Sequence, residues 1–189
     1  MESPWIKEFG TLEKLYEHFC EIPSDIHQHL PLLKEYASKC KTVTEFGFRT
    51  AYSCAALLMG KPKHAVSYDI LDNWDGVKYP EYFTPLVPKG VDWKFVQANT
   101  LLIDIAPTEF LFVDTLHTKT QLAKELKRHA SKVSRFIGFH DTISFGHYGE
   151  DGSSGGLMDS INEFLENNQE WTIVEHKTNN NGLTIIGRN

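Results

Sequence analysis

Two pairs of acidic and histidine residues stand at the ends of two apolar segments in the second half of the chain. Asp114 and His117 follow the first segment, and His140 and Asp141 close the second. Carboxylate and imidazole groups together can bind a divalent cation, and an imidazole, whose pKa is ordinarily near neutrality, can also act as a general base. Taken singly, either histidine is better explained by a helix cap or a buried, hydrogen-bonded ring than by a functional role. Four such residues about one strand–helix–strand unit apart favour a functional site.

The apolar pattern of the chain predicts a scaffold that would bring these residues together. Apolar runs typical of buried strands alternate with runs whose apolar residues recur every three or four positions, as on one face of a helix. The expected strands span residues 41–46, 64–70, 91–97, 110–113 and 133–139. Residues 170–189 predict two further strands joined at an Asn-Gly turn. We therefore expect a single α/β domain over residues 1–189, a three-layer Rossmann-like sandwich around a mostly parallel seven-stranded sheet with a C-terminal antiparallel hairpin.

Polar residues also follow the earlier strands, at the edge where parallel sheets bind their ligands. Glu45 and Gly47 stand at the end of the first strand, Asp69 ends the second, and Asn99 follows the third. Glu45 could hold backbone amides of the next turn or a ligand amino group, and Gly47 would let the backbone approach a ligand where a Cβ would collide. Asp69 offers two acceptors suited to a vicinal diol. Asn99 could pair with an adenine amino group beside a stacking Ile70, or could simply be a turn residue.

Three segments resemble motifs of class I S-adenosylmethionine-dependent methyltransferases. TVTEFGFRTAYSCAALLMG is similar to their first motif, a strand that ends in glutamate before a glycine turn, and VSYDI to the second strand, whose acid binds the ribose hydroxyls. FLFVDTLHTKTQLAKEL and FIGFHD resemble the small-molecule group that includes cephalosporin hydroxylase-like and macrocin O-methyltransferase-like proteins. The resemblance spans roughly residues 31–188 and includes the final hairpin. The sequence departs from the motif at the turn, where one glycine replaces two or three and where larger residues follow it, namely Phe48, Arg49 and Thr50.

This resemblance implies an S-adenosylmethionine-dependent O-methyltransferase that acts on a small polar acceptor, such as a sugar or secondary metabolite. The cofactor would contact the turn and the strand ends through Glu45, Gly47, Phe48, Arg49, Thr50, Asp69, Ile70, Asn99 and Asp114. By the same resemblance, Asp114, His140 and Asp141 would hold a divalent cation, Mg²⁺ or Mn²⁺. The histidine favours Mn²⁺, Zn²⁺ or Fe²⁺ over Mg²⁺, or makes His140 a base instead of a ligand. Asp114, His117 and His140 are accordingly the candidate catalytic residues, and residues 1–40 a candidate helical lid.

Two loops and one connection are candidates for selecting the acceptor or closing the site. The loops, residues 72–83 and 144–156, carry aromatic rings that could stack on a sugar or aromatic acceptor or could pack back onto the domain, namely Trp74, Tyr79, Tyr82, His147 and Tyr148. The connection PSDIHQHLP could close over the pocket, or Ser24 or Asp25 could cap a helical turn.

Other functions stay open from the sequence alone. The same fold could serve as a non-catalytic S-adenosylmethionine- or nucleoside-binding module, or as a metal-dependent hydrolase or hydroxylase-like relative. The net charge of −6 argues against a nucleic-acid partner. No stretch is apolar enough for a membrane span, and three cysteines without metal-ligand spacing favour a cytoplasmic protein. We expect a small-molecule partner and allow for a homodimer.

Overall fold

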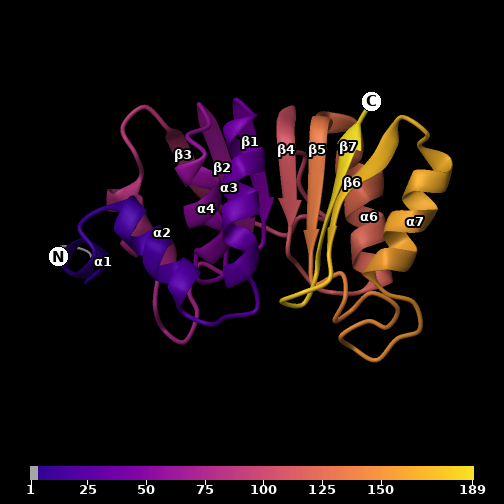
Figure 1. The fold of residues 1–189 in the computed structure, drawn as a ribbon, viewed down its shortest axis with the longest axis horizontal. Helices are drawn as coiled ribbons and strands as arrows, with labels where there is room; N and C mark the ends of the chain where they lie inside the picture. Colours follow the sequence, from indigo (N-terminus) through magenta and orange to yellow (C-terminus); the bar gives the residue numbers. More distant parts are fainter. Residues whose placement is uncertain (1–3) are drawn as a thin grey trace.

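The computed structural model describes residues 4–189 and contains one seven-stranded sheet in the order β3-β2-β1-β4-β5-β7-β6 (Figure 1). The strands are β1 Thr42–Phe46, β2 His64–Asp69, β3 Asp92–Gln97, β4 Thr108–Val113, β5 Val133–His140, β6 Trp171–Lys177 and β7 Leu183–Arg188. Strands β1 to β5 are parallel, whereas β7 is antiparallel to both β5 and β6. The expected mostly parallel sheet with a C-terminal hairpin is therefore confirmed. Residues 1–3 of the expected helical lid lie outside the described residues.

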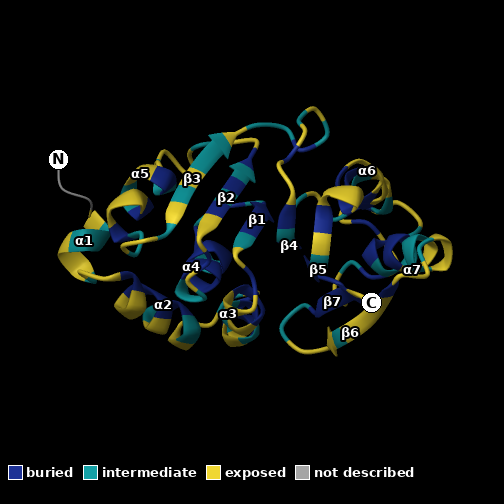
Figure 2. Ribbon diagram, turned by 90° about the horizontal axis from the view of Figure 1, so that it is seen from above, coloured by how far each residue is buried: buried dark blue, intermediate teal, exposed yellow. Residues whose placement is uncertain are grey.

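Helices cover both faces of the sheet and make the sandwich three layers thick (Figure 2). The α-helices are α1 Pro4–Glu8, α2 Leu12–Glu21, α3 Leu30–Ser38, α4 Tyr52–Met59, α5 Tyr79–Phe83, α6 Lys119–His129 and α7 Leu157–Asn167. The structure also has three short 3₁₀ helices, each adjacent to an α-helix: η1 His27–His29, η2 Thr84–Leu86 and η3 Ala130–Lys132. Helices α2 to α5 share one apolar core with one face of the sheet, and α6 and α7 share the other. Among the residues described, no helix is both long and apolar enough to cross a membrane.

The N-terminal helices belong to the body of the sandwich. Leu15 of α2 and Leu33 of α3 are fully buried in the same core as α4, and α2 begins at a Thr11 cap whose hydroxyl accepts from the Lys14 amide. Of the expected lid, the connection between α2 and α3, residues 22–29, is the part that reaches the carboxyl edge of the sheet (Figure 1). That it opens and closes as a lid stays a prediction.

Candidate active site

The site lies where the strand order reverses, between the ends of β1 and β4. The Gly47 amide donates to the Tyr68 carbonyl and the Asp114 amide to the Phe46 carbonyl, both at 2.8 Å. Gly47 has a φ of +90°, and a Cβ there would lie 1.9 Å from the Asp114 carbonyl oxygen. Only glycine fits such a left-handed and crowded position. The close approach predicted for Gly47 is therefore made by the protein backbone itself.

Asp69 holds the turn that follows Gly47. Its Oδ2 accepts from the amides of Phe48 at 2.9 Å and Arg49 at 2.8 Å, and its Oδ1 accepts from the Leu71 amide at 3.1 Å. Arg49 has a left-handed φ of +42°, which its bond to Asp69 helps to maintain. A carboxylate at the end of β2 thus fixes a turn that has one glycine where the related motif has more.

Glu45 does not hold the turn amides, contrary to one role expected from the sequence. Its side chain points away from the turn into the core, where it accepts from the Ser53 hydroxyl at 2.6 Å and the Ser67 hydroxyl at 2.5 Å. Burial raises the pKa of Glu45 to about 7, although the two hydroxyl bonds act in the opposite direction. Strand alternation explains the error, because Glu45 lies on the face of β1 that packs on α4 and not at the exposed strand end.

Two adjoining cavities open at this edge of the sheet. The larger has a volume of about 650 Å³, and of the residues expected to bind a cofactor it is lined by Gly47, Arg49, Asp69, Ile70, Asn99 and Asp114. The smaller, of about 360 Å³, lies on the other side of the turn and adds Phe48 and Thr50. Both have volumes in the range of small-molecule sites. Glu45 lines neither of them. That the others bind a cofactor stays a prediction.

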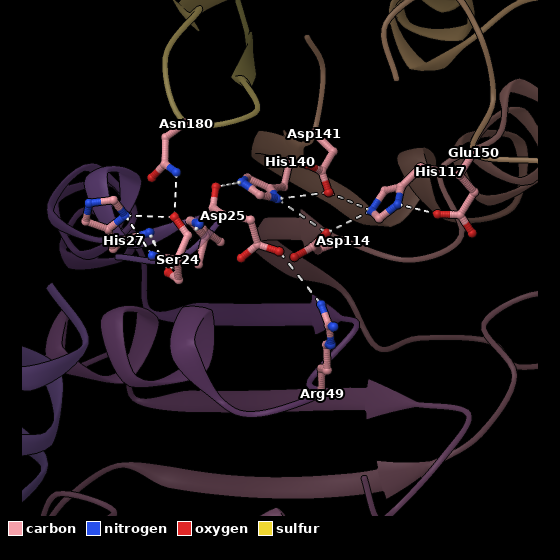
Figure 3. Close-up of polar contacts among 11 residues, drawn as sticks. Ser24, Asp25, His27, Arg49, Asp114, His117, His140, Asp141, Glu150 and Asn180 are labelled. Carbon is pink, nitrogen blue, oxygen red and sulfur yellow. Dashed lines mark hydrogen bonds and ion pairs between the residues drawn. The ribbon is translucent and has the colours of Figure 1, made fainter. Parts of the chain in front are cut away.

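Asp114, His117 and Asp141 line the larger cavity, and His140 lies against the two acids (Figure 3). His117 Nε2 lies 3.1 Å from Asp114 Oδ1 and 3.0 Å from Asp141 Oδ2. His140 Nδ1 lies 3.6 Å from the same Asp114 oxygen and 3.3 Å from the same Asp141 oxygen. The structure therefore brings together all four residues that the sequence singled out. Asp141 has a left-handed φ of +57°, which turns its side chain toward the group.

Each of these four residues shifts the pKa of its neighbours in the group. Burial disfavours a charged imidazole, but the carboxylates of Asp114 and Asp141 outweigh it and raise the pKa of both His117 and His140 to about 10. Burial likewise opposes ionisation of the two acids, but the contacts with His117 and the positive charges of both histidines outweigh it and lower the pKa of each carboxyl. Clusters of such mutually shifted groups in a cavity are typical of functional sites.

Each histidine is held from its other side. His140 Nε2 donates to the Asp25 carbonyl at 3.2 Å, which brings the 22–29 connection to the site (Figure 3). His117 Nδ1 faces Glu150 Oε2 at 2.6 Å, and its ring stacks on Phe145 with centroids 5.0 Å apart. We did not predict Glu150 from the sequence. It lies in the glycine-rich loop 144–156, where neither periodicity nor spacing marks one acid among others.

Asp114, His140 and Asp141 fit a divalent cation. Each offers one ligand atom, and these atoms all lie within 4.8 Å of one another. Two of their buried atoms, His140 Nδ1 and Asp141 Oδ1, have no hydrogen-bond partner in the described chain. Buried polar atoms are rarely left without one, so the pair indicates a missing group.

The larger cavity is also lined by apolar side chains, among them Ile70 and Trp74. The Ile70 side chain is 61% exposed there, and the guanidinium of Arg49 lies 5.9 Å from the centre of the Trp74 ring. Asn99 Oδ1 accepts from the Leu101 amide at 2.9 Å, so Asn99 does form the turn that the sequence allowed as its simpler explanation. Of the five loop aromatics, Trp74 lines this cavity, whereas the Tyr79 and Tyr82 rings pack against Trp5.

Solved structures with the same architecture include methyltransferases. The magnesium protoporphyrin IX methyltransferase ChlM of Synechocystis PCC 6803, solved with bound S-adenosylmethionine, is 10% identical, with 100% of this chain and 86% of that one covered at a TM-score of 0.65. The O-methyltransferase TomG of Streptomyces achromogenes, involved in tomaymycin synthesis, was also solved with S-adenosylmethionine. It is 15% identical, and the match covers 100% of this chain and 91% of that one at a TM-score of 0.62. An O-methyltransferase of Bacillus cereus in complex with S-adenosylhomocysteine is 13% identical, and the match covers 99% of this chain and 96% of that one at a TM-score of 0.58.

The chain has the class I methyltransferase fold. Comparison of the sequence with protein-family models and with curated proteins finds no match. At identities this low, the structural likeness establishes the fold, and the function has to be argued from the site.

Proposed function

We propose that the protein is an S-adenosylmethionine-dependent O-methyltransferase that acts on a small polar acceptor. The observation that carries the proposal is the larger cavity, which is lined both by Asp69 and Ile70 at the end of β2 and by Asp114, His117 and Asp141 of the Asp/His centre. On a sheet of this order, ligands bind where the strand order reverses, and the cavity lies there. The net charge of −6 makes a small acceptor a better candidate than a nucleic acid.

The cofactor would lie across the ends of β1 and β2. Adenine would stack on the exposed Ile70, with Asn99 at its edge, and the ribose hydroxyls would donate to Asp69, which lines the same cavity. The methionine end would pass Gly47 into the smaller cavity, where Thr50 and Ser53 offer hydroxyl groups. This orientation would direct the methyl group towards Asp114, which lines both cavities.

The acceptor would then enter beside the Asp/His centre. Transfer joins the acceptor oxygen to the methyl carbon, breaks the bond between that carbon and sulfur, and releases S-adenosylhomocysteine and a proton. A divalent cation held by Asp114, His140 and Asp141 would lower the pKa of the acceptor hydroxyl. The Glu150 carboxylate, which lines the same cavity and is not one of these ligands, would receive the proton. Without a cation, His117 would be protonated at neutral pH, because the carboxylates of Asp114 and Asp141 raise its pKa to about 10 against the effect of burial, and a carboxylate would be the candidate base in place of the histidine.

Calorimetry with S-adenosylhomocysteine tests the cofactor half of the proposal. We expect micromolar binding by the wild type and at least a tenfold loss in Ile70→Asp, because a carboxylate would replace the apolar surface under the adenine. Ile173→Asp is the matched control, since Ile173 is 42% exposed on β6 and does not line the cavity. No binding at millimolar ligand, or equal losses in the two variants, would refute this placement.

Transfer of a labelled methyl group to a panel of hydroxylated small molecules tests the other half. We expect the rate of methyl transfer to fall when EDTA is added and to recover when Mn²⁺ is supplied. Mn²⁺ is the cation of choice because the proposed ligands include an imidazole. Cofactor binding without transfer to any acceptor would favour the non-catalytic binding module instead.

A further inference from the structure

A buried carboxylate lies directly behind one wall of the larger cavity. Glu125 is on α6 and is 1% exposed, and three side chains that line the cavity, Thr100, Thr115 and Gln121, donate hydrogen bonds to it. We infer that Gln121 accepts a hydrogen bond from the amino group of the cofactor's adenine, and that Glu125 is a positioning residue that orients the Gln121 amide. The inference deepens the proposed function and rests on its cofactor half.

The amide of Gln121 is oriented by the two contacts of its nitrogen. Gln121 Nε2 donates to Glu125 Oε1 at 2.9 Å and to Thr100 Oγ1 at 3.5 Å. These two contacts use both hydrogens of the amide, and an ionised carboxylate can only accept. The Gln121 carbonyl oxygen has no hydrogen-bond partner among residues 4–189. It is therefore the polar group that Gln121 can offer to a ligand in the cavity.

The hydroxyl groups of Thr100 and Thr115 are directed at Glu125 in the same way. The Thr100 hydroxyl donates to Glu125 Oε1 at 2.6 Å, and the Thr115 hydroxyl lies 3.0 Å from both carboxylate oxygens. A hydroxyl group has a single hydrogen, so each of the two oxygens keeps only its lone pairs for other partners. The wall made by Thr100, Thr115 and Gln121 thus offers hydrogen-bond acceptors to the cavity.

Glu125 ties this wall to three elements of the fold. Thr100 follows β3, Thr115 follows β4, and Gln121 lies one turn before Glu125 on α6. His129, one turn further along α6, donates from Nε2 to the Thr100 carbonyl at 2.8 Å. A carboxylate in a protein interior is tolerated where hydrogen bonds replace the water that it loses, and a fully bonded network of this kind is rigid. The direction of the Gln121 amide is therefore set before a ligand binds.

The acceptor wall lies beside the proposed position of the adenine. Thr100 directly follows Asn99, and both line the cavity together with Ile70. Asn99 Oδ1 already accepts from the Leu101 amide at 2.9 Å, which leaves the Gln121 oxygen as the freer acceptor. Adenine carries an amino group at its 6-position, whereas hypoxanthine carries a carbonyl oxygen there. We therefore expect the cavity to favour adenine over hypoxanthine.

Calorimetry with S-adenosylhomocysteine and S-inosylhomocysteine, its 6-oxo counterpart, tests the role of Gln121. We expect the wild type to bind the adenine ligand at least tenfold more tightly, because the hypoxanthine oxygen would face another acceptor. Gln121→Ala should weaken binding of the adenine ligand about 3- to 10-fold and reduce this preference. Gln169→Ala, an exposed change after α7, is the control. A preference that Gln121→Ala leaves unchanged would overturn the assignment of Gln121.

The same pair of ligands tests the role of Glu125. Glu125→Gln keeps the shape of the side chain but adds a hydrogen-bond donor, so Gln121 could turn either its oxygen or its nitrogen to the cavity. We expect the preference for the adenine ligand to fall at least threefold, whereas a merely structural change would weaken both ligands alike and keep their ratio. Glu166→Gln, an exposed change on α7, is the control.

Circular dichroism checks that each variant is folded. If Glu125→Gln does not fold, Glu125→Asp gives the same readout, because its shorter side chain withdraws the carboxylate from Gln121. An affinity ratio equal to that of the wild type in the folded variant would overturn the positioning role.

The wild-type affinities separate this inference from the proposed function. Equal binding of the two ligands would leave the cofactor site in place and overturn the role of Gln121. No binding of either ligand at millimolar concentration would refute the methyltransferase proposal and this inference with it.

Discussion

At the scale of single residues, the turn after β1 shows that contacts with residues distant in the sequence determine the roles of Gly47 and Asp69. Gly47 was recognisable from the sequence because a glycine directly after a buried strand is a common motif. The reason for it was not recognisable, since the atom that excludes a side chain belongs to Asp114, 67 residues further along the chain. Asp69 was likewise predicted as a ligand-binding acid, but its hold on the turn amides depends on the three-dimensional path of the turn.

Alanine substitutions at Gly47 and Gly76 separate the free-energy cost of a left-handed backbone from the free-energy cost of steric crowding. Gly47→Ala would place a methyl group 1.9 Å from the Asp114 carbonyl oxygen, whereas Gly76→Ala, at a similar φ of +79°, meets no atom within 4 Å. We expect Gly76→Ala to lower the free energy of unfolding by about 1 to 2 kcal/mol. Gly47→Ala should lose about 1 to 3 kcal/mol more. Urea denaturation measures both, and equal losses would contradict the crowding seen here.

At the scale of elements, hydrophobic periodicity was enough to predict all seven strands and the terminal hairpin. It also placed the right residues at the strand ends, because the ends of parallel strands share one edge of a sheet. It could not predict which way each side chain points after a strand ends or which loop residue reaches the site. The bonds of Glu45 to Ser53 and Ser67 were not predicted for the first reason, and Glu150 was missed for the second.

Glu45 joins three elements and should make stability depend on pH. Its carboxyl on β1 accepts from Ser67 on β2 and Ser53 on α4, and burial raises its pKa to about 7. The folded state therefore binds a proton more tightly than the unfolded state, so this contribution is complete below pH 4.5 and is lost as the pH rises to about 7. Over that window the loss amounts to about 3 kcal/mol.

Urea denaturation of wild type and Glu45→Gln across pH isolates this effect. The substituted amide would keep the shape of the side chain without its charge, so the variant should gain about 2 to 3 kcal/mol relative to wild type between pH 5 and pH 8. Glu13→Gln, an exposed change on α2, is the control. If the free energies of unfolding of wild type and Glu45→Gln changed in parallel with pH, Glu45 would not titrate in this range.

At the scale of the whole molecule, the turn between β6 and β7 contacts the 22–29 connection, which lies far from it in the sequence. Asn180 Nδ2 donates to the Ser24 carbonyl at 2.6 Å (Figure 3). Asn180 Oδ1 accepts from the Gln28 amide at 2.9 Å. The neighbouring Asn181 carbonyl accepts from Ile143 and Ser144, just beyond Asp141. The sequence predicted this turn for its Asn-Gly pair, but a contact across 152 residues leaves no local pattern.

Asn180→Gly tests whether this turn holds the 22–29 connection in place. Glycine tolerates the left-handed φ of +46° at this position, so the substitution removes the two side-chain bonds and little else. At about 1 kcal/mol per bond, we expect amide exchange of residues 24–29 to accelerate about 10- to 30-fold. Asn181→Gly, which keeps its backbone bonds, is the control. Equal exchange rates in the two variants would contradict the role of Asn180.

A crystal structure grown with S-adenosylhomocysteine and Mn²⁺ tests the central claim most directly, that the larger cavity joins a cofactor site to a cation site. We predict adenine on Ile70, the ribose at Asp69, the sulfur near Asp114, and one Mn²⁺ held by Asp114, His140 and Asp141. A structure at saturating ligand with the cofactor outside this cavity, or with none bound, would contradict the methyltransferase account.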